Sequence, residues 1–198
     1  MASFEDLAQA AVTVTGRADV YQSGAIWSLL GQVVSRVILF GKYGEDYRET
    51  LITLAEPTTY HTAQDYEIDQ TGEGIRTYEV VQIHGTPLEA LLPRDVLMSP
   101  NCPRLNSYYR SGARLEIMFN SDWTEVLIGY YIRPPIVNSY SQYDSHWVLD
   151  AFYSGIMAGV CAAIYRQVGD KDSYAMYEGE FQNLLALFRA ERSDGEVR

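Results

Sequence analysis

Cysteine is scarce in this sequence, with only Cys102 and Cys161 among 198 residues. Two cysteines are too few for the disulfide framework of a small secreted protein, and they favour a reducing compartment. Basic residues are also few: 15 Lys and Arg stand against 26 Asp and Glu, so the formal net charge is −11 at pH 7. Such a chain brings few cations to replace phosphate counterions, which argues against a protein that wraps nucleic acid.

Long apolar runs are missing as well. No segment approaches the roughly 20 apolar residues that a membrane span needs, and residues 1–15 lack the basic start of a signal peptide. The hydrophobic content of 47% is nevertheless sufficient for a sizeable core, and the charged content of 21% is near the globular average. These numbers predict a soluble, acidic protein with one domain or two small lobes.

Tyrosine is abundant, with 16 tyrosines against six phenylalanines. Tyrosine suits surfaces that are buried on one side and wet on the other, as at protein interfaces. A half-exposed sheet rich in strand-forming residues explains the same composition equally well. Composition alone therefore leaves both interpretations open.

The two ends of the chain have the pattern of helices. Ser3 can cap a first helix that ends at Thr15-Gly16-Arg17, and a second helix is expected at about 23–40. Ser145 can cap a long helix to about residue 168, and a short turn connects it to a last helix at about 172–192. The long helix is apolar nearly all round, which predicts burial on more than one side; a neighbouring subunit could supply part of the cover.

The middle of the chain has the composition of β-strands. Short strands are expected at 51–55 and 77–83. Residues 114–119 and 125–133 alternate apolar and polar positions, and Asn120-Ser121-Asp122 between them has turn chemistry. These two runs predict a β-hairpin.

The expected fold class is therefore α+β: an α-helical bundle of two N-terminal and two C-terminal helices with an inserted antiparallel β-region. The bundle would comprise residues 1–42 and 145–192, and the β-rich insert residues 43–144. Residues 193–198 are polar and are expected to form a flexible C-terminal tail.

Few residues suggest catalysis or metal binding. His146 and Asp150 lie four residues apart with Asp144 close by, and His61 and Asp65 repeat this spacing, as a metal corner would require. Neither pair matches a recognised metal motif, and a solvated histidine at a helix N-terminus explains the first equally well.

Signals for nucleophilic catalysis are equally weak. The chain has no GxSxG motif, its carboxylates are scattered, and Cys161 has the setting of a small buried hydrophobe. These observations favour a protein that is not an enzyme and uses no metal and no cofactor. A small metal-dependent or hydrolytic enzyme stays an alternative, because sites assembled only in three dimensions leave no motif.

Several segments follow one another in a distinctive order. They are a short helix over 7–17 closing with Val14-Thr15-Gly16-Arg17, then Tyr43-Gly44-Glu45-Asp46-Tyr47, then strand segments 112–117 and 127–134, then a helix pair over 147–188 with Tyr177-Glu178-Gly179-Glu180-Phe181. In architecture and spacing this order resembles the head-to-tail adaptor proteins of tailed bacteriophages, also called connector, head-completion or gatekeeper proteins. The resemblance spans most of the chain.

The resemblance implies a structural virion protein at the portal vertex, assembled in the host cytoplasm. Such adaptors form a homo-oligomeric ring, typically twelve-fold, between the portal protein above and a tail or nozzle protein below. DNA would pass through the ring during packaging and ejection without specific binding, and no membrane would be involved. An acidic channel wall would not attract phosphates and would let DNA slide, although solubility explains the net charge as well.

The resemblance also nominates residues for assembly, in three sets. Subunit contacts would come from the outward side of the long helix: Trp147, Tyr153, Met157 and Tyr165. Portal contacts would come from the C-terminal tail, which would become ordered on binding: Arg192, Ser193, Asp194, Glu196, Val197 and Arg198. The tail-facing surface would include Tyr108, Tyr109 and Tyr131.

Each nomination has a simpler alternative. The helix residues could be ordinary core, and the C-terminal tail could be plain disorder. A generic protein-binding scaffold module is a further alternative for the whole chain. Oligomeric state separates these hypotheses, because only an adaptor predicts a large ring.

Overall fold

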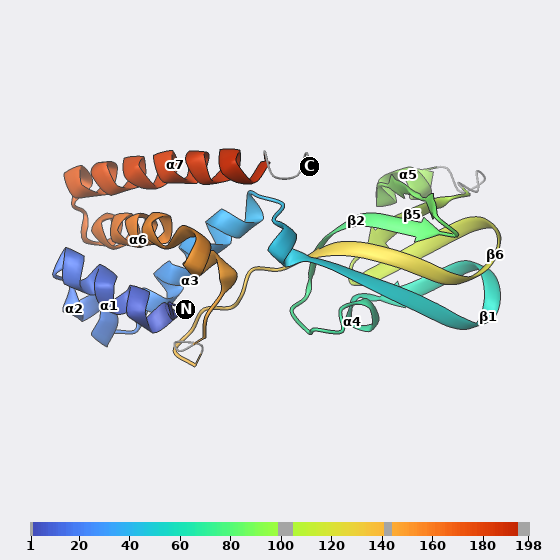
Figure 1. The fold of residues 1–198 in the computed structure, drawn as a ribbon, viewed down its shortest axis with the longest axis horizontal. Coiled ribbons are helices and arrows are strands. Elements are labelled where there is room, and N and C mark those ends of the chain that lie inside the picture. Colours follow the sequence, from blue (N-terminus) through green and yellow to red (C-terminus); the bar gives the residue numbers. More distant parts are fainter. Residues whose placement is uncertain (1, 99–104, 141–143, 194–198) are drawn as a thin grey trace. The chain divides into compact units, whose positions relative to one another are not determined.

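The computed structural model describes residues 2–98, 105–140 and 144–193, and it is a mixed α+β structure with 48% helix and 31% strand (Figure 1). The chain divides into two compact units. Residues 1–45 and 134–198 form the first, called here the helical unit, and residues 46–133 form the second, called the β-unit. The expected insert, 43–144, extends beyond the β-unit at both ends.

The helical unit is built from both ends of the chain. Its helices are α1 (Phe4–Thr15), α2 (Ala18–Gln22), α3 (Ala25–Leu39), α6 (Trp147–Val168) and α7 (Lys171–Ser193), and the 3₁₀ turn η1 (Gly44–Asp46) lies at the boundary with the β-unit. Ser3 caps α1 as predicted: its hydroxyl accepts the amide of Asp6 at 3.1 Å, and the Asp6 carboxylate accepts the Ser3 amide at 2.9 Å. The short helix α2 had no sequence signal strong enough to predict it.

Helix α6 begins one residue later than the predicted cap. The N-cap is His146, not Ser145, and the His146 side chain accepts the amide of Val148. The expectation that no segment approaches the length of a membrane span is wrong, because the 22 residues of α6 are long and apolar enough by length and composition, with a mean hydropathy of 1.6. Because 61% of that apolar window is buried inside the structure, the pattern is also that of a core helix.

The apolar surface of α6 is covered mainly by its own chain. Helices α1, α3 and α7 all pack against it. Close approach is possible at Gly159, where a Cβ atom would lie 2.7 Å from Val33 of α3 and 3.0 Å from Phe181 of α7. These three residues therefore mark the centre of the helical core.

The β-unit contains one nearly closed sheet. Its elements are β1 (Tyr47–Gln64), α4 (Asp65–Ile68), β2 (Ile75–Ile83), β3 (Thr86–Pro87), β4 (Glu89–Leu91), α5 (Pro93–Met98), β5 (Ser107–Ser111) and β6 (Arg114–Ile132). The strand order is β3-β2-β6-β5-β4, with β1 on β6. All pairs are antiparallel except β4 with β5.

Strand β6 organises this sheet. Along one edge it pairs with β1 over nearly its whole length. On the other edge its first half pairs with β5 and its second half pairs with β2. Since β2 and β5 follow one another along the same edge, they bring separate parts of the sequence together at their junction.

The predicted hairpin over 114–133 is wrong, because β6 is one continuous strand. Asn120, Ser121 and Asp122 are exposed within it, at the place where the pairing of β1 with β6 shifts register. Strand β1 likewise continues through Pro57 instead of stopping at residue 55. A two-residue turn at Gly112-Ala113 instead joins β5 to β6, and Gly112 adopts the positive φ of 64° that this turn needs.

Candidate functional site

The nominated residues on α6 bury much of their surface against other residues of the same chain. Trp147, Tyr153 and Met157 are half-buried and pack against the helical core. Tyr165 stacks on Tyr177 of α7, with ring centroids 5.6 Å apart and an interplanar angle of 14°. Each of these side chains therefore offers a partner only its remaining exposed part.

The exposed positions of α6 are of a different kind. In its first half they are Asp150, Ala151 and Ser154, which are polar or small. Larger apolar groups are exposed elsewhere on the helical unit: Phe40 after α3 is 72% exposed, and Met176 and Leu187 on α7 are 60% and 62% exposed. These three residues were not nominated from the sequence. Met176 and Leu187 lie outside the apolar stripe of α7, and this position on the helix could have predicted their exposure.

The C-terminal end of α7 is held by aromatic and ionic contacts. The guanidinium of Arg192 lies 5.1 Å from the ring centroids of both Trp147 and Phe188, and it forms an ion pair with Glu45. The ring of Tyr43 packs against both of these rings, with its centroid 5.2 Å from that of Trp147 and 5.6 Å from that of Phe188. This cluster fixes the point from which the chain continues beyond α7.

The nominated C-terminal segment is described only up to the end of α7. Ser193 is the last residue of α7. Asp194, Glu196, Val197 and Arg198 lie outside the described residues. Arg192 is thus the nominated portal-contacting residue whose surroundings are known.

The nominated tyrosines of the β-unit differ in exposure. Tyr108 and Tyr131 are 8% and 7% exposed, because Tyr108 belongs to the β-unit core and Tyr131 packs against Tyr47 and Arg76. They have little surface left for a partner. Tyr109 is half-buried and lies directly across from Glu116 of β6.

A polar cluster on β1 and β6 was not found from the sequence. The buried carboxylate of Glu116 accepts hydrogen bonds from the hydroxyls of Tyr60 and Thr62. The hydrogen bond to Glu116 raises the pKa of Tyr60, so this tyrosine stays a donor at neutral pH. Tyr60 is half-exposed at 50% and lies close enough to Tyr109 to interact with it electrostatically, so two tyrosines with exposed surface are near one another on this face.

The metal site that the spacing of His146, Asp150 and Asp144 could have formed is not found in the part of the chain that the structure describes. There, no group of three or more His, Cys, Asp or Glu side chains lies close enough to hold a metal ion. His146 is occupied as the N-cap of α6, and Asp150 accepts the backbone amide of Ala2 at 3.2 Å. His61 instead meets the ring of Trp123 edge-on at 5.9 Å.

Cys161 is buried in the middle of α6, whereas Cys102 lies outside the described residues. Burial raises the pKa of the Cys161 thiol to about 11, so the thiol is neutral at physiological pH. In the unfolded chain the thiol ionises at lower pH, so its contribution to stability is present below about pH 9 and is lost between pH 9 and pH 11. A neutral buried thiol is a packing group and a poor nucleophile.

We expect Cys161 to react at least roughly a hundredfold more slowly with a thiol reagent in the folded protein than in guanidinium, because both its ionised fraction and its accessibility are reduced. The variant Cys102→Ser isolates this residue, and absorbance with an aromatic disulfide reagent follows the reaction. Equal rates in the folded and denatured protein would contradict the burial of this thiol.

No protein-family model matches the chain, and no curated protein sequence matches it.

Proposed function

We propose that this protein is a head-to-tail adaptor of a tailed bacteriophage, a structural virion protein that forms a ring between the portal and the tail. The observation that supports this most is the way one chain builds two compact units. The helical unit is made from both ends of the chain, and the β-unit is inserted between Glu45 and Pro134 with its own core. An adaptor needs two such bodies, one for the ring and one for the next component of the junction.

In this proposal the four longer helices α1, α3, α6 and α7 form the ring-building bundle. The exposed parts of Tyr153 and Met157, together with Phe40, Met176 and Leu187, supply apolar surface for contact with a second copy. Interfaces in obligate rings are more apolar than ordinary protein surface, so exposed large side chains on a helical unit suit this role.

The portal contact is assigned to the segment that follows α7. Because Arg192 is held against Trp147, Phe188 and Glu45, that segment leaves the helical unit from a fixed position. Residues 193–198 would then make the contacts with the portal.

The β-unit is assigned to the tail or nozzle protein. Of the nominated tyrosines, Tyr109 keeps part of its ring exposed, and Tyr60 beside it is half-exposed. Tyrosines of this kind combine apolar area with a hydroxyl that can reach a partner. Tyr60 and Tyr109 are therefore the tail-facing residues that this proposal favours.

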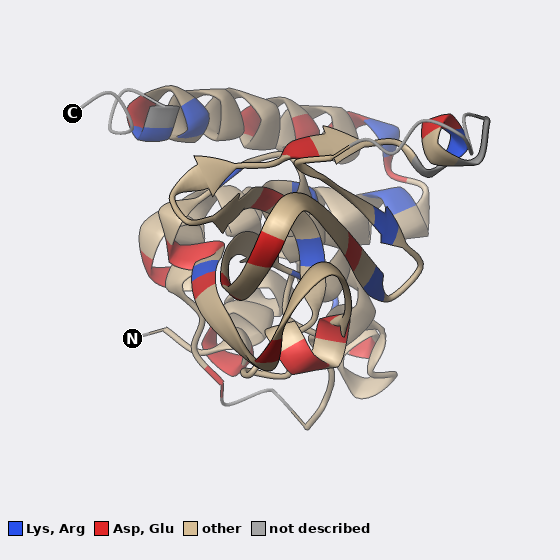
Figure 2. Cartoon of the chain, turned by 90° about the vertical axis from the view of Figure 1, so that its right-hand side faces the viewer, with Lys and Arg blue, Asp and Glu red and all other residues tan. Residues whose placement is uncertain are grey.

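The acidic charge suits a channel through which DNA passes. Acidic residues are spread over both helices and strands, with fewer basic residues among them (Figure 2). A surface of this sign repels the phosphate backbone and does not hold DNA in place. The protein would then occupy the portal vertex without binding a DNA sequence and without a membrane.

Mass photometry of the purified protein, alone and mixed with a portal protein, tests this function. We expect either a ring with a mass about twelve times the 22.4 kDa of one chain, or such a complex that forms only with the portal. A variant ending at Ser193 is expected to keep its circular dichroism spectrum and to lose the portal complex. A protein that stays monomeric in both conditions would contradict the proposal.

A further inference from the structure

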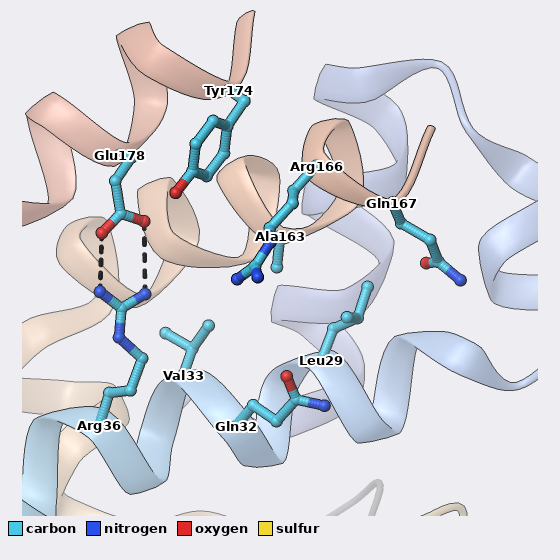
Figure 3. Close-up of a pocket in the computed structure, with 9 residues that line it drawn as sticks. All are labelled: Leu29, Gln32, Val33, Arg36, Ala163, Arg166, Gln167, Tyr174 and Glu178. Atoms are coloured by element: carbon cyan, nitrogen blue, oxygen red, sulfur yellow. Dashed lines mark hydrogen bonds and ion pairs between the residues drawn. The ribbon is translucent and has the colours of Figure 1, made fainter. Parts of the chain in front are cut away.

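A cleft of about 370 Å³ opens between α3, α6 and α7 in the helical unit (Figure 3). Its apolar lining includes Leu29 and Val33 of α3, and its polar lining includes side chains from all three helices. Arg36, Arg166 and Tyr174 are the groups that decide its chemistry. The cleft lies within a single unit, so its geometry depends only on helices that pack against one another.

The positive charge of one arginine in the cleft, Arg36, is balanced by a carboxylate. The guanidinium of Arg36 donates to both carboxylate oxygens of Glu178, at 2.7 Å and 3.3 Å. This hydrogen bonding lowers the pKa of Glu178, which therefore stays ionised at neutral pH. The pair contributes no net charge to the cleft.

The second arginine, Arg166, attracts the same carboxylate from beyond ion-pair distance, and its charge also lowers the pKa of Glu178. The guanidinium of Arg166 makes no hydrogen bond or ion pair with the residues that the structure describes, and neither does the hydroxyl of Tyr174. Figure 3 shows the Arg166 guanidinium and the Tyr174 hydroxyl both turned into the cleft. The cleft thus offers one positive charge and a hydroxyl donor beside the apolar side chains of Leu29 and Val33.

We propose that this cleft binds a carboxylate group attached to a short apolar stem. Arg166 would hold the carboxylate through paired N–H donors, because a planar guanidinium matches the two carboxylate oxygens. Tyr174 would donate a further hydrogen bond, and the stem would lie against Leu29 and Val33. A single negative charge fits better than a phosphate dianion, because one unpaired guanidinium faces it and Glu178 lies nearby.

Two sources can supply this group: an acidic side chain of a second copy of the chain, or a small free carboxylate. The chain has 26 Asp and Glu, so the first source is abundant wherever copies meet. The proposal stands independently of the adaptor function, since the cleft exists within one chain. A failure of ring formation therefore leaves it untouched.

Propionate is the simplest probe, because it has one carboxylate and a short apolar stem. In a ¹H–¹⁵N NMR titration at low salt we expect saturable shifts at Arg166 and at residues around the cleft. Arg166→Gln is expected to weaken binding at least about tenfold, since a charge-assisted hydrogen-bonded contact is lost. Tyr174→Phe is expected to weaken it a few-fold, through loss of one neutral hydrogen bond.

The matched control is Arg94→Gln, which removes the same charge from a side chain that is 77% exposed in the β-unit. This variant is expected to bind propionate like the original protein. The proposal is overturned if the shifts do not saturate, if chloride produces the same shifts, or if Arg166→Gln binds propionate unchanged.

Sedimentation velocity with and without propionate then distinguishes the two sources. If propionate dissociates an oligomer, the natural occupant is a side chain of a second copy. If propionate binds and leaves the oligomeric mass unchanged, the natural occupant is a free carboxylate. Both results support the site.

Discussion

Phe181→Ala is expected to lower the free energy of unfolding of the helical unit by about 3–5 kcal/mol, as large-to-small changes at buried aromatic positions do. Phe181 is fully buried, it packs against Phe152 with ring centroids 6.4 Å apart, and its ring lies 4.7 Å from the guanidinium of Arg36. The alanine would leave a cavity beside Gly159, which has no side chain to fill it.

Urea denaturation followed by tryptophan fluorescence measures this change, because Trp27 and Trp147 both lie in the helical unit. Leu187→Ala is the matched control on the same helix. Its side chain is 62% exposed, so we expect a change within about 0.5 kcal/mol. If the two variants lose similar amounts of unfolding free energy, the face of α7 that carries Phe181 is not the buried one.

Arg110→Ala is expected to lower the stability of the β-unit by about 2–4 kcal/mol, because the change leaves an uncompensated, largely buried carboxylate. Arg110 of β5 forms an ion pair with Asp65, whose side chain is 16% exposed, and donates to the carbonyl oxygens of Ile75 and Arg76. Tyr78 donates to the other oxygen of Asp65 at 2.6 Å. The arginine therefore joins β5, β2 and the end of β1 where the sheet nearly closes.

Burial and the hydrogen bond to Asp65 raise the pKa of Tyr78, so the phenol remains a donor throughout the neutral range. In the variant, hydrogen exchange of the β2 amides near residues 75–78 should accelerate more than exchange in the middle of β6. Arg94→Ala, which changes an exposed arginine of the same unit, should leave both unchanged. Unaltered exchange in β2 after loss of Arg110 would refute this role in closing the sheet.

Local signals predicted the four longer helices well. The Ser3 capping box sets the start of α1, and the apolar spacing of α3, α6 and α7 gives helices whose observed ends differ by only one or two residues from those expected. Caps and amphipathic spacing depend on residues three or four positions apart, so the sequence displays them directly.

The strands were harder to predict, because their partners are distant in sequence. Asn120-Ser121-Asp122 has the composition of a turn, yet pairing with β1 keeps the chain extended through it. Pro57 is tolerated within β1 where the register with β6 shifts. The cleft at Arg166 was also invisible in the sequence, because α3, α6 and α7 bring together side chains more than 100 positions apart only after they pack.

The nesting of the β-unit within the helical unit also dictates an order of events during synthesis. All residues of the β-unit have left the ribosome once Arg133 emerges, so this unit can fold while translation continues. Helices α1 and α3 emerge earlier but must wait for α6 and α7 before their apolar faces, including Leu7 and Val33, are covered. During that interval the nascent chain displays an unfinished hydrophobic core, which is the stage at which a chaperone would have most to protect.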